Sequence, residues 1–257
     1  MYDVSTLSRH KPGIPTERSV WLRPEPAARR PKHSRDDIAE AALRIADQDG
    51  LEAVSMRRVA AELDAGTMTL YHYVSTKAEL LALLFDAVIG ELLVEESEWP
   101  DDWRAATMAI AEKTKSTLLR HPWVLDIVDP PGGLGPNAVR HYEQSHRALV
   151  ELNVSLAEKV DIIAAVDEYI FGYCKRRREI ETGSDDDESL GEQLAYLHAL
   201  VNTGEFPYLA KMTAGEDVAT MWRDTMKAMS DPARFERHVG SLLDAFAATS
   251  FPDRRRR

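Results

Sequence analysis

The 257-residue sequence contains one cysteine, Cys174, so no disulfide can form within one chain. A chain without disulfides fits a reducing compartment, and we expect a cytoplasmic protein. No apolar run approaches the roughly 18 residues that span a bilayer. The N-terminal segment also lacks the continuous apolar stretch of a secretory signal. These absences predict a protein that does not enter a membrane.

The short motifs of common enzymes are absent as well. The sequence has no G-x-S-x-G, no H-E-x-x-H, no Walker loop and no dinucleotide fingerprint. His141 and His146 lie five residues apart, and no third residue stands at metal-ligand spacing from them. We therefore expect no enzymatic activity, no metal and no cofactor.

Basic residues are fewer than acidic ones, 32 Lys and Arg against 43 Asp and Glu, so the formal net charge is −11. A chain this acidic should be repelled by nucleic acid, but the charge is unevenly distributed. Residues 1–77 hold 12 Lys and Arg against 11 Asp and Glu, whereas the remaining residues hold 20 against 32. The excess acid therefore lies outside the N-terminal segment, which removes the electrostatic objection to DNA binding there.

Apolar residues recur at helical spacing along most of the chain, and no segment alternates as a strand does. The sequence predicts an all-α fold. Ser34 is expected to cap the first helix, and Ser155 with Glu158 forms a capping-box pair that starts a long one. The expected helices cover residues 34–50, 56–63, 67–73, 76–95, 102–120, 123–128, 137–152, 155–180, 189–203, 215–228 and 232–249.

Two short helices in the N-terminal region, Met56–Leu63 and Thr67–Tyr73, are joined by the turn Asp64-Ala65-Gly66. Two helices packed across so short a turn leave the second one protruding, as in proteins that place a helix in the DNA major groove. A surface corner between two helices, without a role in DNA binding, is the alternative that spacing alone leaves open.

The side chains of this region suit contacts with phosphates and base edges. Hydroxyl groups and a ring nitrogen can form hydrogen bonds, and the side chain of Met68 can pack on a thymine methyl. Lys77 adds a cation at the start of a helix, where backbone N–H groups already favour phosphate. The predicted DNA-binding residues are Ser55, Arg57, Thr67, Met68, Thr69, Tyr71, His72, Tyr73 and Lys77.

Residues 34–90 resemble the N-terminal domain of the tetracycline-repressor (TetR) family of transcriptional regulators. The family pattern stands here as Ser55, Arg57, Val59-Ala60, Asp64-Ala65, Thr69-Leu70-Tyr71-His72-Tyr73 and Lys77-Ala78-Glu79-Leu80-Leu81. The resemblance implies that the nine residues named above face DNA and that Leu70 points inward. Asp64 departs from the family, which usually has glycine in this turn. Because Asp tolerates the left-handed conformation, we expect the turn to survive at a cost of about 1 kcal/mol.

The C-terminal part carries a weaker resemblance to the same family. Residues 151–173 resemble the long central helix of the tetracycline repressors, and residues 235–246 resemble their last dimer helix. This implies a domain that binds an effector and forms a homodimer. Polar or aromatic side chains on apolar helical faces could line its pocket. The predicted ligand-binding residues are Met108, Trp123, Tyr142, His146, Asp167, Phe171 and Trp222. Plain core packing is the alternative for each aromatic residue and methionine, and an exposed or salt-bridged position is the alternative for Asp167 and His146.

The predicted organisation is a flexible basic arm (1–33), a three-helix DNA-binding domain with a helix-turn-helix (34–80), a larger helical domain for effector binding and dimerisation (81–250), and a basic tail (251–257). The arm carries seven Lys and Arg against three Asp and Glu, and it could add phosphate or minor-groove contacts. We expect a repressor that binds a palindromic operator in double-stranded DNA as a homodimer and is released by a small, largely apolar molecule. The alternative is a helical ligand-binding or enzymatic module that has kept a vestigial hairpin.

Overall fold

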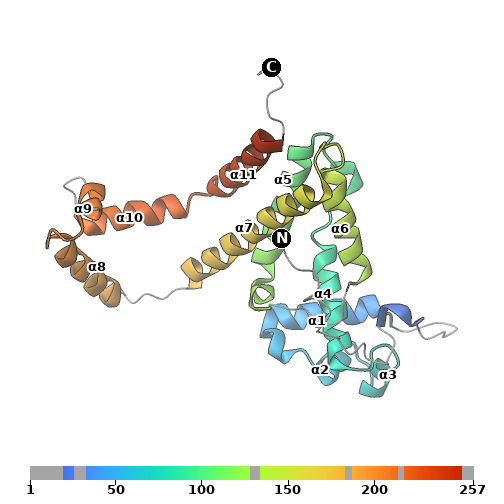
Figure 1. Ribbon diagram of the computed structural model, residues 1–257. Helices are drawn as coiled ribbons and strands as arrows, with labels where there is room; N and C mark the ends of the chain where they lie inside the picture. The colour runs from blue at the N-terminus through green and yellow to red at the C-terminus, as the bar shows by residue number, and fades with distance from the viewer. Residues whose placement is uncertain (1–19, 26–32, 128–133, 183–186, 214–216, 251–257) are drawn as a thin grey trace, which may run out of the picture. The chain divides into compact units, whose positions relative to one another are not determined.

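The computed structural model describes residues 20–25, 33–127, 134–182, 187–213 and 217–250. These residues form eleven α-helices and no strand, so the all-α prediction is confirmed (Figure 1). None of the described helices is both long and apolar enough to cross a bilayer. The helices are α1 (Arg35–Asp49), α2 (Met56–Glu62), α3 (Thr67–Tyr71), α4 (Lys77–Gly90), α5 (Trp103–Arg120), α6 (Pro136–Ala148), α7 (Leu156–Thr182), α8 (Asp187–Val201), α9 (Pro207–Thr213), α10 (Val218–Met229) and α11 (Arg234–Ser250).

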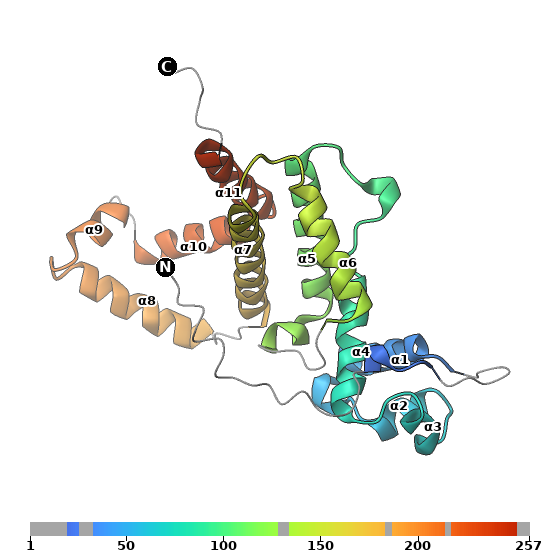
Figure 2. The ribbon, with the colours of Figure 1, turned by 45° about the vertical axis from the view of Figure 1, so that its right-hand side comes forward.

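The chain divides into two compact units. Unit 1 comprises residues 1–95 and 126–145, and unit 2 comprises residues 96–125 and 146–257. In unit 1, α1 packs on α4, and α2 packs on both α1 and α3 (Figure 1 and Figure 2). The side chains that join these helices are fully buried and apolar: Ile38, Ile45, Leu70, Leu80 and Leu84. Their burial removes apolar surface from water and is the main force that holds the short helices together.

The start of α1 follows the local rules that predicted it. The Ser34 hydroxyl accepts a hydrogen bond from the backbone N–H of Asp37 at 3.1 Å, and the Asp37 carboxylate accepts one from the N–H of Ser34 at 2.7 Å. The hydrogen bonds from Ser34 also lower the pKa of Asp37. This reciprocal pair satisfies two N–H groups that the helix leaves free, and it fixes where α1 begins.

A buried carboxylate joins α4 to the first residues of α6. Asp86 on α4 accepts hydrogen bonds from the backbone N–H groups of Asn137 and Ala138 at 3.0–3.1 Å. In return, the Asn137 side chain donates to the Asp86 carbonyl at 3.0 Å. Gly135 lies so close to the Asp86 carboxylate that a Cβ atom at this position would collide with it. The carboxylate thus caps the N-terminus of α6 from a different helix, which suits its negative charge.

Unit 2 has its own core, formed by α5, α7 and α11. Phe235 and Val239 of α11 pack against Ile162, Ile170 and other buried side chains of α7 and α5. The predicted capping pair at the start of α7 is confirmed, because the Glu158 carboxylate accepts from the Ser155 N–H at 2.8 Å. Helices α8, α9 and α10 pack on one another as a second group.

Several predicted helix boundaries were wrong. The helix expected at 123–128 is a 3-10 helix over Pro122–Asp126, and α9 was missed because its seven residues are too few for a periodic pattern. Helix α4 ends at Gly90 rather than near residue 95, and α6 ends at Ala148 rather than near 152. After Ala148 the buried Leu149 and Leu152 belong to turns, which continued the apolar spacing beyond the helix.

The prediction of a flexible arm at 1–33 does not hold for Val20–Glu25. Val20–Leu22 forms a short 3-10 helix, and Val20 is only 1% exposed. An apolar side chain buried to this degree holds the segment on the rest of unit 1. The other residues of the predicted arm, except His33, and the predicted tail at 251–257 lie outside the described residues.

Candidate nucleic-acid interface

The turn between α2 and α3 is closed by the one described non-glycine residue with a positive φ, Asp64 at +49°. The Asp64 N–H donates to the Ala61 carbonyl at 3.2 Å, and the Ala65 N–H donates to the Ala60 carbonyl at 2.9 Å. This pair of hydrogen bonds is the Schellman motif, which ends a helix through one left-handed residue. The prediction that Asp64 adopts the conformation usually given to glycine is confirmed.

Helix α3 is five residues long and is held by one side. Leu70 is fully buried, whereas Met68 is 73% exposed and Tyr71 is 45% exposed. Thr69 and His72 are exposed as well, and Thr67 is half-buried. One deeply buried leucine thus anchors the helix while the side chains of the opposite face remain free to meet a partner. The predicted DNA-binding residues of α3 share this exposed face, Thr67 at its edge.

Two further predicted residues stand at the start of α2. Ser55 caps the helix, and its hydroxyl accepts from the Arg58 N–H at 3.3 Å. Arg58 forms an ion pair with Asp49 at 2.8 Å, whereas the exposed Arg57 has no ion-pair partner among the described residues. Because Arg57 is not committed to a carboxylate, its guanidinium is available to a phosphate.

Lys77 opens α4 and is exposed. The hydroxyl of the preceding residue, Thr76, accepts from the Glu79 N–H at 3.1 Å and so caps the helix. The lysine therefore stands on the first turn of a capped helix, where its charge adds to the partial positive charge of free N–H groups.

The prediction for Tyr73 does not fit its position. Tyr73 is only 6% exposed, and Val74 beside it is fully buried. Both follow Leu70 by three and four residues, so they continue the inward face that Leu70 begins. This spacing was readable in the sequence once Leu70 was assigned to the interior. We leave Tyr73 out of the proposed DNA-contacting surface.

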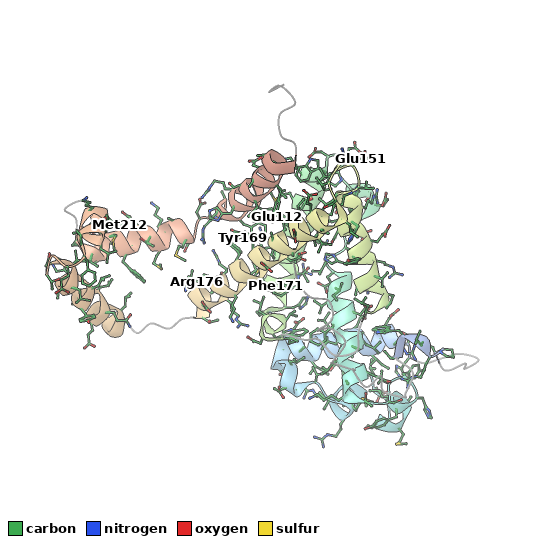
Figure 3. The ribbon with its side chains drawn as sticks, viewed as in Figure 1. Glu112, Glu151, Tyr169, Phe171, Arg176 and Met212 are labelled. Atoms are coloured by element: carbon green, nitrogen blue, oxygen red, sulfur yellow. The ribbon has the colours of Figure 1, made fainter. Side chains whose placement is uncertain are left out.

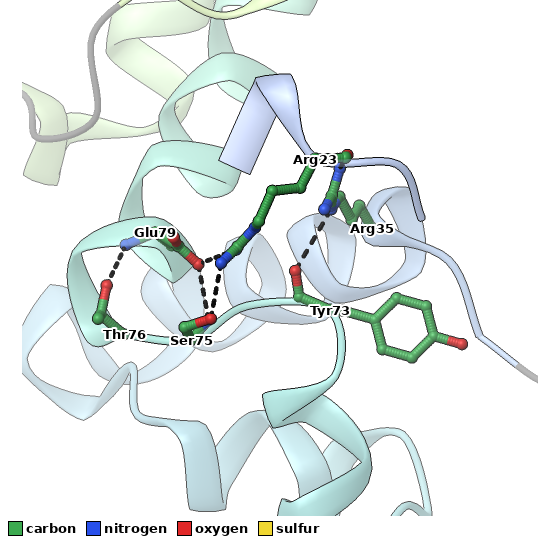
Figure 4. A network of polar contacts seen from close by, with 6 residues as sticks. All are labelled: Arg23, Arg35, Tyr73, Ser75, Thr76 and Glu79. Carbon is green, nitrogen blue, oxygen red and sulfur yellow. Dashed lines mark hydrogen bonds and ion pairs between the residues drawn. The ribbon is translucent and has the colours of Figure 1, made fainter. Parts of the chain in front are cut away.

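The sequence did not predict the polar contacts around residues 73–79, which connect α3 to the first turn of α4 (Figure 4). Arg23 donates to the Ser75 hydroxyl at 2.7 Å and forms an ion pair with Glu79. Arg35 donates to the carbonyl of Tyr73 at 3.4 Å and to the carbonyl of Arg23 at 2.8 Å. Only the pair Thr76 and Glu79 carried a signal, since it has the spacing of a capping box.

The seven predicted ligand-binding residues are spread over several elements. Tyr142, on α6 in unit 1, is 60% exposed, and Phe171 on α7 is 44% exposed. Met108 packs partly buried against the core of unit 2, and Trp123 lies with its ring centroid 6.2 Å from that of His121. His146 and Trp222 are half-buried on α6 and α10. A cavity of about 290 Å³ between α8 and α10 is lined by Leu194, His198 and Val218 among others, and by none of the seven.

Asp167 is the predicted ligand-binding residue with unusual electrostatics. It is half-buried on α7, and burial raises the pKa of its carboxyl to about 6. Two residues further along, Tyr169 (labelled in Figure 3) is half-buried. Its ring centroid lies 5.8 Å from that of Phe235. The buried hydroxyl of Tyr169 has no hydrogen-bond partner among the described residues. Polar groups in this state favour a ligand that can pair with them.

Two family models match the chain on either side of residue 90. The model described as "Bacterial regulatory proteins, tetR family" matches residues 38–84. The model described as "Tetracyclin repressor-like, C-terminal domain" matches residues 97–227, which is more than half of the chain.

The chain belongs to the TetR family.

It is a transcriptional regulator of that family, and the resemblance read from the sequence is confirmed. Among curated relatives, the HTH-type transcriptional repressor DrrR1 of Streptomyces coeruleorubidus is 37% identical over 194 residues, covering 72% of this chain and 70% of the relative. An HTH-type transcriptional regulator of Saccharopolyspora erythraea is 36% identical over 155 residues, covering 60% of this chain and 65% of the relative.

Solved structures of TetR-family proteins share the fold. ActR of Streptomyces coelicolor, solved in complex with actinorhodin, is 27% identical, with a TM-score of 0.62 over 84% of this chain and 96% of ActR. BioQ, solved with its double-stranded DNA operator, is 22% identical, with a TM-score of 0.51 over 84% of this chain and 99% of BioQ. At that identity the likeness to BioQ concerns the fold alone.

Proposed function

We propose that this TetR-family regulator is a repressor that binds a pseudo-palindromic operator as a homodimer. A small, largely apolar molecule that binds unit 2 releases it. The observation that carries the proposal is the recognition helix α3, with Leu70 fully buried and Met68 and Tyr71 exposed on the opposite face. A short helix held in this way presents a preformed surface to the major groove.

The proposed DNA-contacting surface consists of eight residues. Side chains of α3 and of the residue after it meet base edges, and those at the starts of α2 and α4 meet phosphates. Arg57 and Lys77 supply two cations to this surface, and neither has an ion-pair partner among the described residues. The eight residues are Ser55, Arg57, Thr67, Met68, Thr69, Tyr71, His72 and Lys77.

Dimerisation through α7 and α11 is supported by an apolar stripe on α7. Ala157, Val160, Ala164 and Phe171 are exposed, and their spacing of three, four and seven residues keeps them on one face. Two copies that pack α7 and α11 together form a four-helix bundle and bury this stripe. Such a twofold dimer carries two copies of α3 to two half-sites.

Release by an effector is supported by two observations. ActR, a relative of the same fold, was solved in complex with actinorhodin. In this chain, the raised pKa of Asp167 and the unpartnered hydroxyl of Tyr169 mark polar groups in a largely apolar setting within unit 2. An effector shifts the equilibrium only if it binds the DNA-incompetent conformation more tightly than the competent one.

In vitro selection tests the function directly. The full chain is incubated with a library of randomised DNA duplexes, and bound duplexes are amplified and sequenced over several rounds. We expect an inverted repeat whose half-sites lie about 10 base pairs apart or a multiple of that, bound by two copies of the chain. Enrichment of no sequence would favour the alternative, a helical ligand-binding or enzymatic module with a vestigial hairpin.

A further inference from the structure

The short segment Val20–Arg23 precedes the DNA-binding helices in the sequence but contacts their far end. Val20 is 1% exposed, and Arg23, three residues later, reaches residues 52 and 56 positions further along the chain. Such a long-range contact is unusual for a segment that the sequence predicts to be flexible. The residues that Arg23 contacts, Ser75 and Glu79, lie just after the recognition helix.

The guanidinium of Arg23 joins two groups at the start of α4. It donates to the Ser75 hydroxyl at 2.7 Å, and it pairs with the Glu79 carboxylate, whose side chain is only 14% exposed (Figure 4). The same carboxylate accepts from the Ser75 N–H at 2.6 Å. Arg23, Ser75 and Glu79 therefore form a closed set of charge-assisted hydrogen bonds, which are stronger than neutral ones.

A second arginine closes the arrangement from the other side. Arg35, the first residue of α1, donates to the Tyr73 carbonyl and also to the carbonyl of Arg23 (Figure 4). The backbone between α3 and α4 is thus held at Tyr73 by Arg35 and at Ser75 by Arg23. Arg35 also holds the backbone of the segment that carries Arg23. We call these four residues, Arg23, Arg35, Ser75 and Glu79, the arginine brace.

We propose that the arginine brace fixes the connection between the recognition helix and α4, and that Arg23 is a positioning residue for operator binding that does not itself touch DNA. Helix α3 is only five residues long, too short to be stable by its own hydrogen bonds. Its orientation depends on the buried Leu70 and on the segment that follows. Holding this segment before DNA arrives removes an ordering cost from the binding step.

This proposal rests on the proposed function, and it differs from the expectation that a basic arm contacts phosphates. The two are separable, because the number of neutralised phosphates sets the salt dependence of binding. The slope of log K against log salt is negative, and each lost phosphate contact reduces its magnitude by about 0.9. A positioning residue lowers the affinity at every salt concentration and leaves the slope unchanged.

The experiment measures fluorescence anisotropy of the selected duplex with the full chain and four variants, from low to high salt. Arg23→Ala should weaken binding about 5- to 10-fold, because the segment after α3 must then be ordered during binding, and the slope should not change. The affinity of Arg23→Lys should fall nearly as far, because one ammonium group cannot reproduce the planar guanidinium that donates to both Ser75 and Glu79. Arg23→Ala combined with Glu79→Gln should bind no worse than Arg23→Ala, since the interaction is already lost. Lys77→Ala is the control, and the magnitude of its slope should fall by about 0.9.

Wild-type affinity for Arg23→Ala overturns the proposal. A shallower salt dependence for Arg23→Ala together with full rescue by Arg23→Lys also overturns it, because this result identifies Arg23 as a phosphate contact. Hydrogen exchange on the free proteins supplies a readout without DNA: amides of residues 74–79 should exchange faster in Arg23→Ala. If the wild-type chain enriches no duplex, the proposed function fails, and the exchange rates alone then decide whether the brace holds this segment.

Discussion

Two buried or half-buried aspartates, one in each unit, have opposite surroundings. Asp86 in unit 1 is 5% exposed and accepts from the backbone N–H groups of Asn137 and Ala138. Asp167 in unit 2 is half-buried, forms no hydrogen bond with a described residue, and has a carboxyl pKa raised to about 6 by burial. A carboxylate with partners stabilises the fold around it, whereas one without partners costs stability when it is charged. The first serves the fold, and the second is the residue that we propose for a ligand.

The two predicted sites also differ in how far apart their residues lie along the sequence. The proposed DNA-contacting residues lie within 23 consecutive positions, Ser55 to Lys77, and local geometry largely places them. The core of unit 2 joins Ala111 on α5 to Leu243 on α11, so its interior depends on contacts between distant parts of the chain. The predictions below test how far this difference extends, from the largest expected effect to the smallest.

The largest effect is expected at Leu70, the anchor of the recognition helix. Leu70→Ala removes a fully buried side chain and should lower the free energy of unfolding by about 2–5 kcal/mol, with loss of operator binding. Met68→Ala, two residues earlier and 73% exposed, should change stability by less than about 0.5 kcal/mol while weakening binding. Denaturant unfolding and anisotropy measure the two quantities. Equal stability losses for both variants would contradict the division of α3 into an anchored and a free face.

The second-largest loss of stability is expected when Asp86, the cap on α6, is removed. Asp86→Ala leaves the N–H groups of Asn137 and Ala138 without their acceptor, and this should cost about 1–3 kcal/mol of stability at pH 7. The matched control is Glu40→Ala, which removes an exposed carboxylate from the same unit and should stay within about 0.5 kcal/mol. Urea denaturation checks both. A loss at Asp86 no larger than that at Glu40 would show that the cap contributes little.

Asp167 should behave in the opposite way. Because its pKa is about 6 in the folded chain and about 3.9 when unfolded, the folded state holds the proton more tightly, so stability falls as pH rises between these values. Asp167→Asn removes the titrating group and should raise the free energy of unfolding by about 1–2 kcal/mol at pH 7.5, with little change at pH 4. Denaturant curves across this range measure the difference. A stabilisation that does not depend on pH would not come from the buried charge.

The smallest effect is expected at the turn. Asp64 has a φ of +49°, a region in which glycine has no steric penalty, so Asp64→Gly should raise stability by up to about 1 kcal/mol. Asp64→Ala, which cannot relieve the strain, should not. Thermal unfolding compares the two, and stabilisation by alanine as large as that by glycine would exclude backbone strain as the cause.

The sequence predicted those features that depend on a few neighbouring residues. The Ser34 cap, the Ser155–Glu158 pair and the left-handed Asp64 each follow from local backbone chemistry, and all three are confirmed. The contacts of Arg23 could not be predicted, because its partners lie 52 and 56 residues away and no local sequence pattern indicates them. Tyr73 could have been assigned to the interior from its spacing after Leu70. The exposed Tyr142 and Phe171 show why an apolar helical pattern does not by itself identify a pocket.

The most direct test of the central claim is the affinity of the Tyr71→Ala, Lys77→Ala double variant for the selected duplex. Both side chains are exposed, so the fold should remain intact, as circular dichroism and thermal unfolding would verify. We expect anisotropy titrations at fixed salt to show affinity at least about 100-fold weaker than wild type, since one phosphate contact and one major-groove contact are lost. Unchanged affinity in the folded variant would contradict the assignment of α3 and the start of α4 to the DNA surface.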